Sequence, residues 1–329
     1  SYTEESRDSS LKDLTFTSPA VNGNLPLSPA FNPEVTNYTM DVPFSVDRLT
    51  VNAVKNWEGA KVAISGNESL TAGAVNTITI TVTSEDEHSY TVYTVKVTRS
   101  TNDYTLSSQP NGNGWYKGDV TIIPTKPYVE IWDGNQWRSN LTVGNEGENN
   151  VGFKLRMANG VESTQLSIKI RIDKTVPAGE IKIRNSVFKS FLNTITFGLF
   201  FKNTINVNIT GTDTYSGLDK IEYQVVNKGE TYNPDGTWSL YNSLSIQPNA
   251  QCVIYARFTD KAGNVSIINS DGVVVYTDSS ISPTSAVFDK YNESDNYRDI
   301  SLTLTLNGNT LNGVKCGNTT LVLDRDYTV

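Results

Sequence analysis

The chain has 329 residues, enough for roughly two to four small domains. Its 16 Tyr and 11 Phe residues, against two Met and one His, favour strands over helices. A net charge of −8 with no cluster of Lys or Arg excludes a nucleic-acid-binding surface, because phosphate groups need cationic partners. The single histidine, His88, leaves little room for Ser/His/Asp or Cys/His catalysis, and no phosphate-binding glycine loop is present.

Residues 1–8 are expected to be a linker, since they have neither the basic nor the apolar segment of a signal peptide. From the composition of both ends, we expect the sequence to be an internal segment of a longer chain. From residue 9 to 101 the pattern changes to alternating apolar and polar residues, as at Ile78, Ile80 and Val82, which predicts half-buried strands.

Two stretches of residues 9–101 carry a family resemblance. They are LKDLTFTSPAVNGNLPLSPAFNPEVTNYTMDVP (11–43) and VNTITITVTSEDEHSYTVYTVKVTR (75–99). Together they resemble the cadherin-like β-sandwich module of bacterial surface proteins and secreted enzymes. Glu85 to His88 depart from that family's acidic-Gly turn, so we expect a longer or looser hairpin there, with His88 in solvent.

An internal repeat follows. DGNQWRSNLTV (133–143) matches DGTWSLYNSLSI (235–246), which makes Trp137 and Trp238 equivalent at a spacing of 101 residues. Upstream, WYKGDVTI (115–122) matches FFKNTINVNI (200–209) at a spacing of 200 − 115 = 85 residues. A period near 100 residues with Asp-Gly turns is typical of tandem antiparallel sandwiches, and it predicts domains at 102–176 and 177–280.

The most apolar run, FLNTITFGLFF (191–201), has 11 residues, whereas a membrane-spanning helix needs about 20. We therefore predict no membrane insertion in this segment. Its Phe, Ile and Thr content favours short strands in the core of the third domain, with Phe200 and Phe201 standing where Trp115 and Tyr116 stand in the second.

The third domain, 177–280, resembles the bacterial immunoglobulin-like domains of large surface proteins. The resemblance depends on the 190–204 segment SFLNTITFGLFFKNT, on DTYSG (213–217) and on YARFTDKAGNVS (255–266). The last of these predicts a hairpin in which Asp260 and Asn264 bond local backbone and Gly263 has positive φ. Residues 102–176 resemble the same class more weakly.

Residues 281–329, with SPTSAVFDKYN and the following LTLNGNTLNGVKCGNTTL, resemble the beginning of the X2 immunoglobulin-like modules found beside carbohydrate-active enzymes. They amount to about half of such a module, so we predict a truncated, poorly ordered tail if the chain ends at Val329. The fold class predicted for the whole chain is all-β: tandem immunoglobulin-like and cadherin-like antiparallel β-sandwiches arranged as an elongated rod, each closing its own core. Cys252 and Cys316 fall in different domains, so no disulfide is expected.

Exposed aromatic residues are the main functional candidates, because sugar rings stack on Trp and Tyr faces. The carbohydrate-binding candidates are Trp132, Trp137, Tyr128, Trp115 and Trp57. Core packing is the competing interpretation, and it is favoured for Trp137 by its equivalent Trp238.

Calcium is the single cofactor that the sequence suggests. Related tandem modules bind Ca²⁺ through Asp and Asn oxygens, and the candidate ligands are Asp213, Asp219 and Asp260. Solvated turn residues are the alternative interpretation, since no EF-hand-like loop is present.

These features favour a non-catalytic region of a secreted or cell-wall-attached bacterial protein. It would act as an extracellular spacer or adhesion stalk, monomeric, with weak binding to a polysaccharide or a host or cell-surface glycan. An accessory carbohydrate-binding region of a multimodular extracellular glycoside hydrolase is the alternative. An unrecognised enzyme would instead need a deep cleft with two carboxylates about 5 to 10 Å apart.

Overall fold

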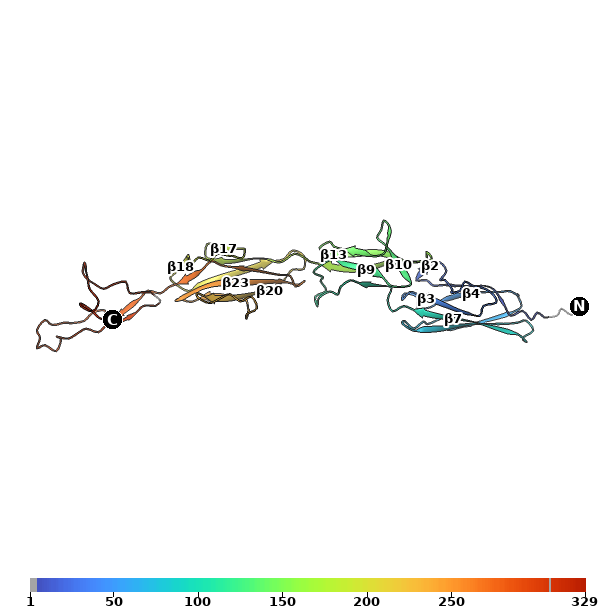
Figure 1. The fold of residues 1–329 in the computed structure, drawn as a ribbon, viewed down its shortest axis with the longest axis horizontal. Helices are drawn as coiled ribbons and strands as arrows, with labels where there is room; N and C mark the ends of the chain where they lie inside the picture. Colours follow the sequence, from blue (N-terminus) through green and yellow to red (C-terminus); the bar gives the residue numbers. More distant parts are fainter. Residues whose placement is uncertain (1–4, 308) are drawn as a thin grey trace. The chain divides into compact units, whose positions relative to one another are not determined.

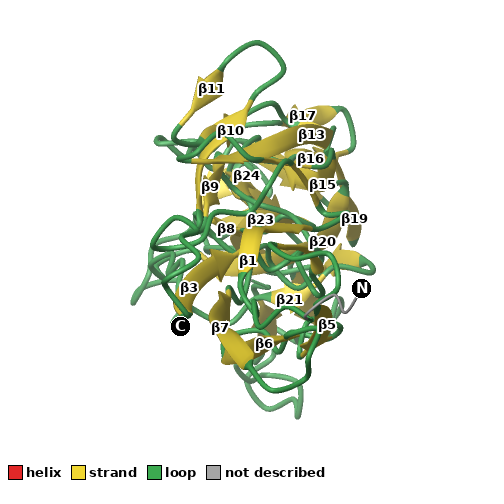
Figure 2. Cartoon of the chain, turned by 90° about the vertical axis from the view of Figure 1, so that its right-hand side faces the viewer, coloured by secondary structure: helices red, strands yellow, loops and turns green. Residues whose placement is uncertain are grey.

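The computed structural model describes residues 5–307 and 309–329, and these residues form strands and loops without a helix (Figure 2). No described segment is therefore a helix that could cross a membrane. The predicted all-β class is confirmed. The chain divides into two compact units, Ser1–Lys174 and Thr175–Val329.

The first module is a sandwich of a four-stranded sheet and a two-stranded sheet (Figure 1). The larger sheet has the order β3-β7-β6-β5 and the smaller pairs β1 with β4. Its strands are β1 (Leu11–Thr17), β3 (Asn37–Val42), β4 (Thr50–Lys55), β5 (Lys61–Ser65), β6 (Val75–Thr83) and β7 (Tyr90–Arg99). Ile78, Ile80 and Val82 of β6 are fully buried, so the predicted alternation is confirmed. The β3–β7 pair is parallel, which the prediction of antiparallel sheets did not include.

The second module packs a three-stranded sheet, β12-β9-β8, against a sheet with the order β11-β10-β13-β14-β2, in which β15 also pairs with β13. Its own strands are β8 (Tyr104–Leu106), β9 (Val120–Pro124), β10 (Tyr128–Trp132), β11 (Trp137–Arg138), β12 (Leu141–Val143), β13 (Gly147–Met157), β14 (Glu162–Ser163) and β15 (Leu166–Ile172). The remaining strand, β2 (Val21–Asn22), comes from the first module.

The first two modules share one hydrophobic core. A continuous cluster of buried side chains runs from Leu11 in β1 to Ile172 in β15. At the crossing point β2 pairs with β14, and the Thr164 amide donates to the carbonyl of Ala20 (3.1 Å). The expectation that each block closes its own core is therefore wrong for these two, because β2 leaves its sandwich and extends the neighbouring sheet.

The third module has a separate core. A four-stranded sheet, β17-β16-β19-β22, faces a sheet with the order β18-β25-β23-β20-β21, in which β24 also pairs with β23. The first sheet contains β16 (Ala178–Ile183), β17 (Ser186–Phe188), β19 (Ile205–Thr212) and β22 (Leu244–Ile246). The second contains β18 (Leu199–Phe201), β20 (Leu218–Asn227), β21 (Ser239–Leu240), β23 (Ala250–Asp260), β24 (Val265–Asn269) and β25 (Val273–Val275).

The apolar run 191–201 is only partly interior. Phe201 is 7% exposed and packs in the core, but Phe200 is 63% and Phe191 44% exposed. The prediction of a wholly interior run is wrong because β18 is an edge strand, paired with β25 alone, whose alternate side chains point to opposite faces. Phe201 does correspond to Tyr116, since both are buried and both lie beside a parallel partner strand.

Residues 281–307 and 309–329 contribute two short strand pairs and no core. These are β26 (Ser280–Ser282) with β27 (Thr303–Thr305), and β28 (Lys315–Cys316) with β29 (Thr319–Thr320). None of the described residues in this stretch is buried, and apolar side chains such as Val287 and Phe288 are more than half exposed. Cys252 and Cys316 are both free thiols.

Candidate functional site

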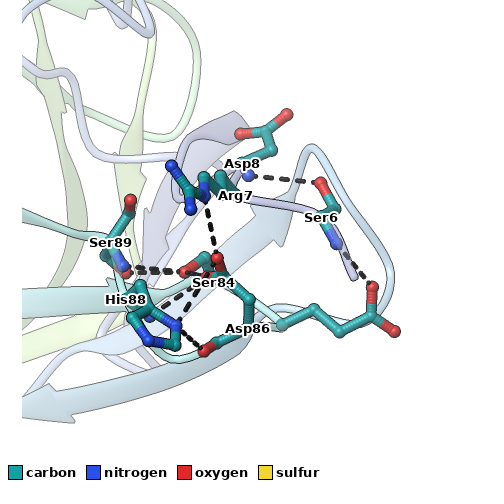
Figure 3. A network of polar contacts seen from close by, with 8 residues as sticks. Ser6, Arg7, Asp8, Ser84, Asp86, His88 and Ser89 are labelled. Carbon is teal, nitrogen blue, oxygen red and sulfur yellow. Dashed lines mark hydrogen bonds and ion pairs between the residues drawn. The ribbon is translucent and has the colours of Figure 1, made fainter. Parts of the chain in front are cut away.

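The β6–β7 hairpin loop, residues 84–89, is tightly bonded (Figure 3). Asp86 accepts hydrogen bonds from the Ser84 hydroxyl (2.6 Å), the His88 amide (3.0 Å) and Arg7 Nε (3.1 Å). These bonds, the Ser84 hydroxyl first, lower the pKa of Asp86. The loop is thus longer than a tight turn but not loose, and Ser6 and Arg7 of the expected linker are hydrogen-bonded to it. His88 has a side chain 78% exposed, as predicted for a solvated turn residue.

The five aromatic candidates do not form one surface. Tyr128 is 1% and Trp115 is 8% exposed, so their rings have no free face for a sugar. Trp57 is 46% exposed in the first module, where its indole N–H donates to Glu85 (2.8 Å). Trp132 and Trp137 are partly exposed and are the two candidates in contact, with ring centroids 5.5 Å apart at 55°.

Trp132 and Trp137 are held by a hydrogen-bonded hairpin. They are direct cross-strand partners on β10 and β11, joined by residues 133–136. In the turn, Asp133 Oδ1 accepts from the amides of Asn135 and Gln136 (both 2.8 Å), its Oδ2 accepts from Arg138 Nε, and Gly134 has a φ of 98°. The Gln136 amide and the Arg138 side chain lower the pKa of Asp133 to about 2. The Asp133 carboxylate therefore stays ionised until the pH falls to about 2. Its contribution to the stability of the turn is lost as the pH falls through this folded-state pKa.

Charged side chains lie beside the two tryptophans. The guanidinium of Arg156 on β13 covers the Trp137 ring, 4.2 Å from its centroid, and its Nε donates to Glu130 (2.8 Å). Lys154 of the same strand forms an ion pair with Glu162 (3.8 Å). Sequence reasoning missed these residues. The available signal was that Arg156 and Arg257 share the 101-residue spacing of Trp137 and Trp238.

The third module repeats the Trp–Arg–Glu arrangement. Arg257 lies 4.5 Å from the Trp238 ring centroid and its Nε donates to Glu222 (2.9 Å). The strand register extends the correspondence. Glu130 faces Arg156 as Glu222 faces Arg257. The next pair on the same face of the sheet is Trp132 with Lys154 in the second module and Gln224 with Tyr255 in the third, so Trp132 has no aromatic equivalent.

The corresponding face of the third module is covered by its own side chains. The Tyr232 ring stacks on Tyr255 with centroids 3.9 Å apart and planes within 5°, and Phe191 lies 6.1 Å from both. Tyr255 is only 5% exposed as a result.

Two of the three calcium candidates lie together. Carboxylate oxygens of Asp213 and Asp260 are within 4.8 Å of each other, while Asp219 is exposed on β20. Asp213 Oδ1 accepts from the Gly217 amide (2.8 Å), but its buried Oδ2 has no hydrogen-bond partner among the described residues. Asp260 accepts from the amide of Asn264 (2.8 Å) and from its side chain (2.9 Å), as predicted for this turn. Asp213 Oδ2 and Asp260 are thus oxygen donors of the kind that Ca²⁺ takes.

Two surface grooves in the first unit lack paired carboxylates. The larger is lined by Lys12, Ala53, Val54, Lys55, Asn56, Glu58, Ala60, Lys61 and Val62, with Glu58 as its single carboxylate. The smaller groove, beside Met40 and Met157, has Asp41 as its single carboxylate. Neither has the two carboxylates that glycoside hydrolysis requires.

Family models match both ends of the chain. Residues 11–100 match the cadherin-like beta sandwich domain, and residues 281–329 match the carbohydrate binding domain X2. Both resemblances inferred from the sequence are confirmed, and both domains are of non-catalytic types.

Two relatives come from clostridial bacteria. Cellulose-binding protein A of Clostridium cellulovorans is 26% identical over 210 residues, which cover 57% of this chain and 10% of the relative. Exoglucanase-2 of Thermoclostridium stercorarium is 54% identical over 137 residues, which cover 40% of this chain and 14% of the relative. The chain thus spans a small part of either relative's length.

Solved structures of β-sandwich modules also match. The fibronectin(III)-like modules of Clostridium thermocellum CbhA align over 57% of this chain and all of theirs, with 11% identity and a TM-score of 0.25. Drosophila N-cadherin EC1-4 aligns over 74% of this chain and 73% of its own, with 10% identity and a TM-score of 0.24. Such low scores carry no functional argument. The family matches identify a carbohydrate-associated modular region.

Proposed function

We propose that this chain, with its cadherin-like module and its X2 segment, is a non-catalytic extracellular spacer that also binds polysaccharide weakly. In this proposal it belongs to a secreted or cell-wall-attached bacterial protein. It would hold other domains at a fixed distance from a cell surface or a polysaccharide.

The observation that carries the spacer function is the continuous core of the first two modules. Independent sandwiches on a flexible linker would pivot freely, whereas here the β2–β14 strand pair crosses the module boundary. Burying Val21, Met157 and Val161, each at most 6% exposed, further opposes bending. Resistance to bending is the property that a spacer needs. The elongated arrangement stays a prediction, which small-angle scattering by the whole chain would measure.

Polysaccharide as the partner is supported by the X2 match and by the names of both clostridial relatives. The same relatives support an extracellular location. A net charge of −8 also argues against an anionic polymer as the partner.

Sedimentation with insoluble cellulose tests the binding function. The whole chain, incubated with microcrystalline cellulose, should partition into the pellet in a saturable manner, while serum albumin stays in the supernatant. Release of reducing sugar should not exceed that of the albumin control. A chain that stays wholly in the supernatant with cellulose, xylan and mannan would refute the binding function.

An accessory role in a glycoside hydrolase is a second candidate, supported by the 54% identity to a segment of an exoglucanase. The two candidates differ in what they do to a linked catalytic domain. An accessory region should accelerate hydrolysis of insoluble cellulose, but not of soluble cellohexaose, when it is joined to a cellulase. A pure spacer should change neither rate.

A further inference from the structure

We infer that the outer face of β10, β11 and β13 is a binding platform for a neutral β-linked glucan chain. In this assignment Trp132 supplies the main stacking face, beside Trp137 whose ring is covered on one side by Arg156, and Glu130, Lys154 and Arg156 bind sugar hydroxyls. The inference rests on the proposed polysaccharide binding and places it in residues 128–162, which neither matched family model covers.

The tryptophans face outward on a clamped hairpin. Ile131 is fully buried between the two sheets, so its neighbour Trp132 points away from the core, as does its cross-strand partner Trp137. Both rings are partly exposed, and the Asp133 turn holds them in place without a ligand. A sugar that stacks on a pre-ordered surface loses less entropy on binding than one that orders a loop.

The charges around the tryptophans cancel. Arg156 pairs with Glu130, and Lys154 pairs with Glu162, so two cations and two anions border the rings. These side chains remain 28% to 38% exposed and have donors and acceptors left for hydroxyl groups. A face without net charge fits a neutral polysaccharide better than an anionic wall polymer. A β-linked glucan offers C–H faces for stacking and hydroxyls along its edges, which matches two rings bordered by ion pairs.

In the third module the corresponding sheet face is covered by a side chain of the same chain. There the 228–238 loop between β20 and β21 is long enough to fold back, and its Tyr232 lies flat on Tyr255. Tyr255 takes the place of Lys154. In the second module only residues 133–136 join β10 to β11, too few to fold back in this way. The same sheet position thus accepts a flat ring from the chain in one repeat and stays open to a ligand in the other.

Affinity electrophoresis of the whole chain in gels containing hydroxyethylcellulose tests the assignment. Trp132→Ala should weaken binding at least about tenfold, the effect of removing an interface anchor. Trp132→Tyr should retain most of the affinity, because it keeps an aromatic face. Trp57→Ala removes a more exposed tryptophan from the first module, and it should bind like the unsubstituted chain.

Lys154→Ala guards against a folding defect at Trp132, since the lysine side chain is 37% exposed. It should weaken binding about two- to tenfold without changing the circular dichroism spectrum. If neither Trp132→Ala nor Lys154→Ala weakens binding while the unsubstituted chain binds, the platform is refuted and the polysaccharide-binding proposal stands. If the unsubstituted chain is not retarded, the glucan platform is refuted, and the binding function is then decided by sedimentation with cellulose, xylan and mannan. Stronger retardation in polygalacturonate than in hydroxyethylcellulose would overturn the assignment of a neutral ligand.

Discussion

At the residue scale, a buried carboxyl group sits where the first two modules meet. Asp103 is 8% exposed and its Oδ1 accepts from the Ser45 amide (3.2 Å), while its own carbonyl accepts from the Thr125 amide (2.9 Å). Burial raises the pKa of Asp103, and it also raises that of the nearby Tyr128. The junction therefore holds a carboxylate whose charged form is disfavoured by its surroundings.

Asp103→Asn should remove a pH dependence of stability. A carboxyl pKa raised in the folded state favours folding below the unfolded value of 3.8, and this contribution is lost as pH rises through the folded pKa. The unsubstituted chain should thus lose stability relative to Asp103→Asn as the pH rises above 3.8, whereas below 3.8 the two should have the same pH dependence. Urea midpoints measured at a series of pH values provide the test. A relative loss for Asp103→Asn with rising pH would contradict this account.

At the element scale, two glycines let one aromatic ring close the third module. Gly179 on β16 and Gly211 on β19 are cross-strand partners, and the fully buried Phe258 of β23 lies over both. A methyl group at Gly211 would stand 2.6 Å from Cδ1 of that ring. The sheets can approach here because neither glycine has a side chain.

Gly211→Ala should destabilise the third module by about 1 to 3 kcal/mol, because the added methyl overpacks a filled core. Gly198→Ala is the matched control in the same unit. Its methyl would meet nothing closer than 3.9 Å, so a change within about 0.5 kcal/mol is expected. Differential scanning calorimetry of the whole chain measures both. The double variant Gly211→Ala with Phe258→Leu should lose less stability than the two single losses added together, because the smaller side chain makes room for the methyl group and contacting residues couple.

At the scale of the whole molecule, stability is partitioned between two cores that do not follow the module boundaries. One cluster serves the first two modules and the other serves the third. Opening of the second module should therefore expose side chains of the first. The alternative, one cooperative unit per module, is what the repeat alone would suggest.

Ile122→Ala, which removes a fully buried side chain of β9, should cost about 2 to 5 kcal/mol. It should accelerate amide hydrogen exchange in β6 and β13 alike, because both strands contribute to the same cluster. Ile254→Ala in β23 makes a comparable cavity in the third module and should leave β6 unchanged. Faster exchange confined to β13 after Ile122→Ala would show that the two modules open separately.

Much of the local structure was predictable because it depends on near neighbours. Alternation placed Ile78, Ile80 and Val82 on the buried face of β6, and the Asp260–Asn264 turn follows from side chains that bond backbone four residues away. The equivalence of Trp137 with Trp238 came from spacing, and both carry the same arginine contact.

The long-range features needed the tertiary structure. Nothing in the composition of Val21–Asn22 indicates that this short strand pairs with β14, about 140 residues further along the chain. Tyr128, Trp115 and Trp132 are all aromatic residues within one module, yet the first two are buried and the third is partly exposed.

The sequence by itself determined the β class, the module types and the turn chemistry, since these depend on side-chain alternation and on residues within a few positions of one another. The tertiary structure alone decided that two modules share a core and which tryptophan keeps a free face. Those outcomes depend on the register between distant strands and on whether a connecting loop is long enough to fold back over the sheet.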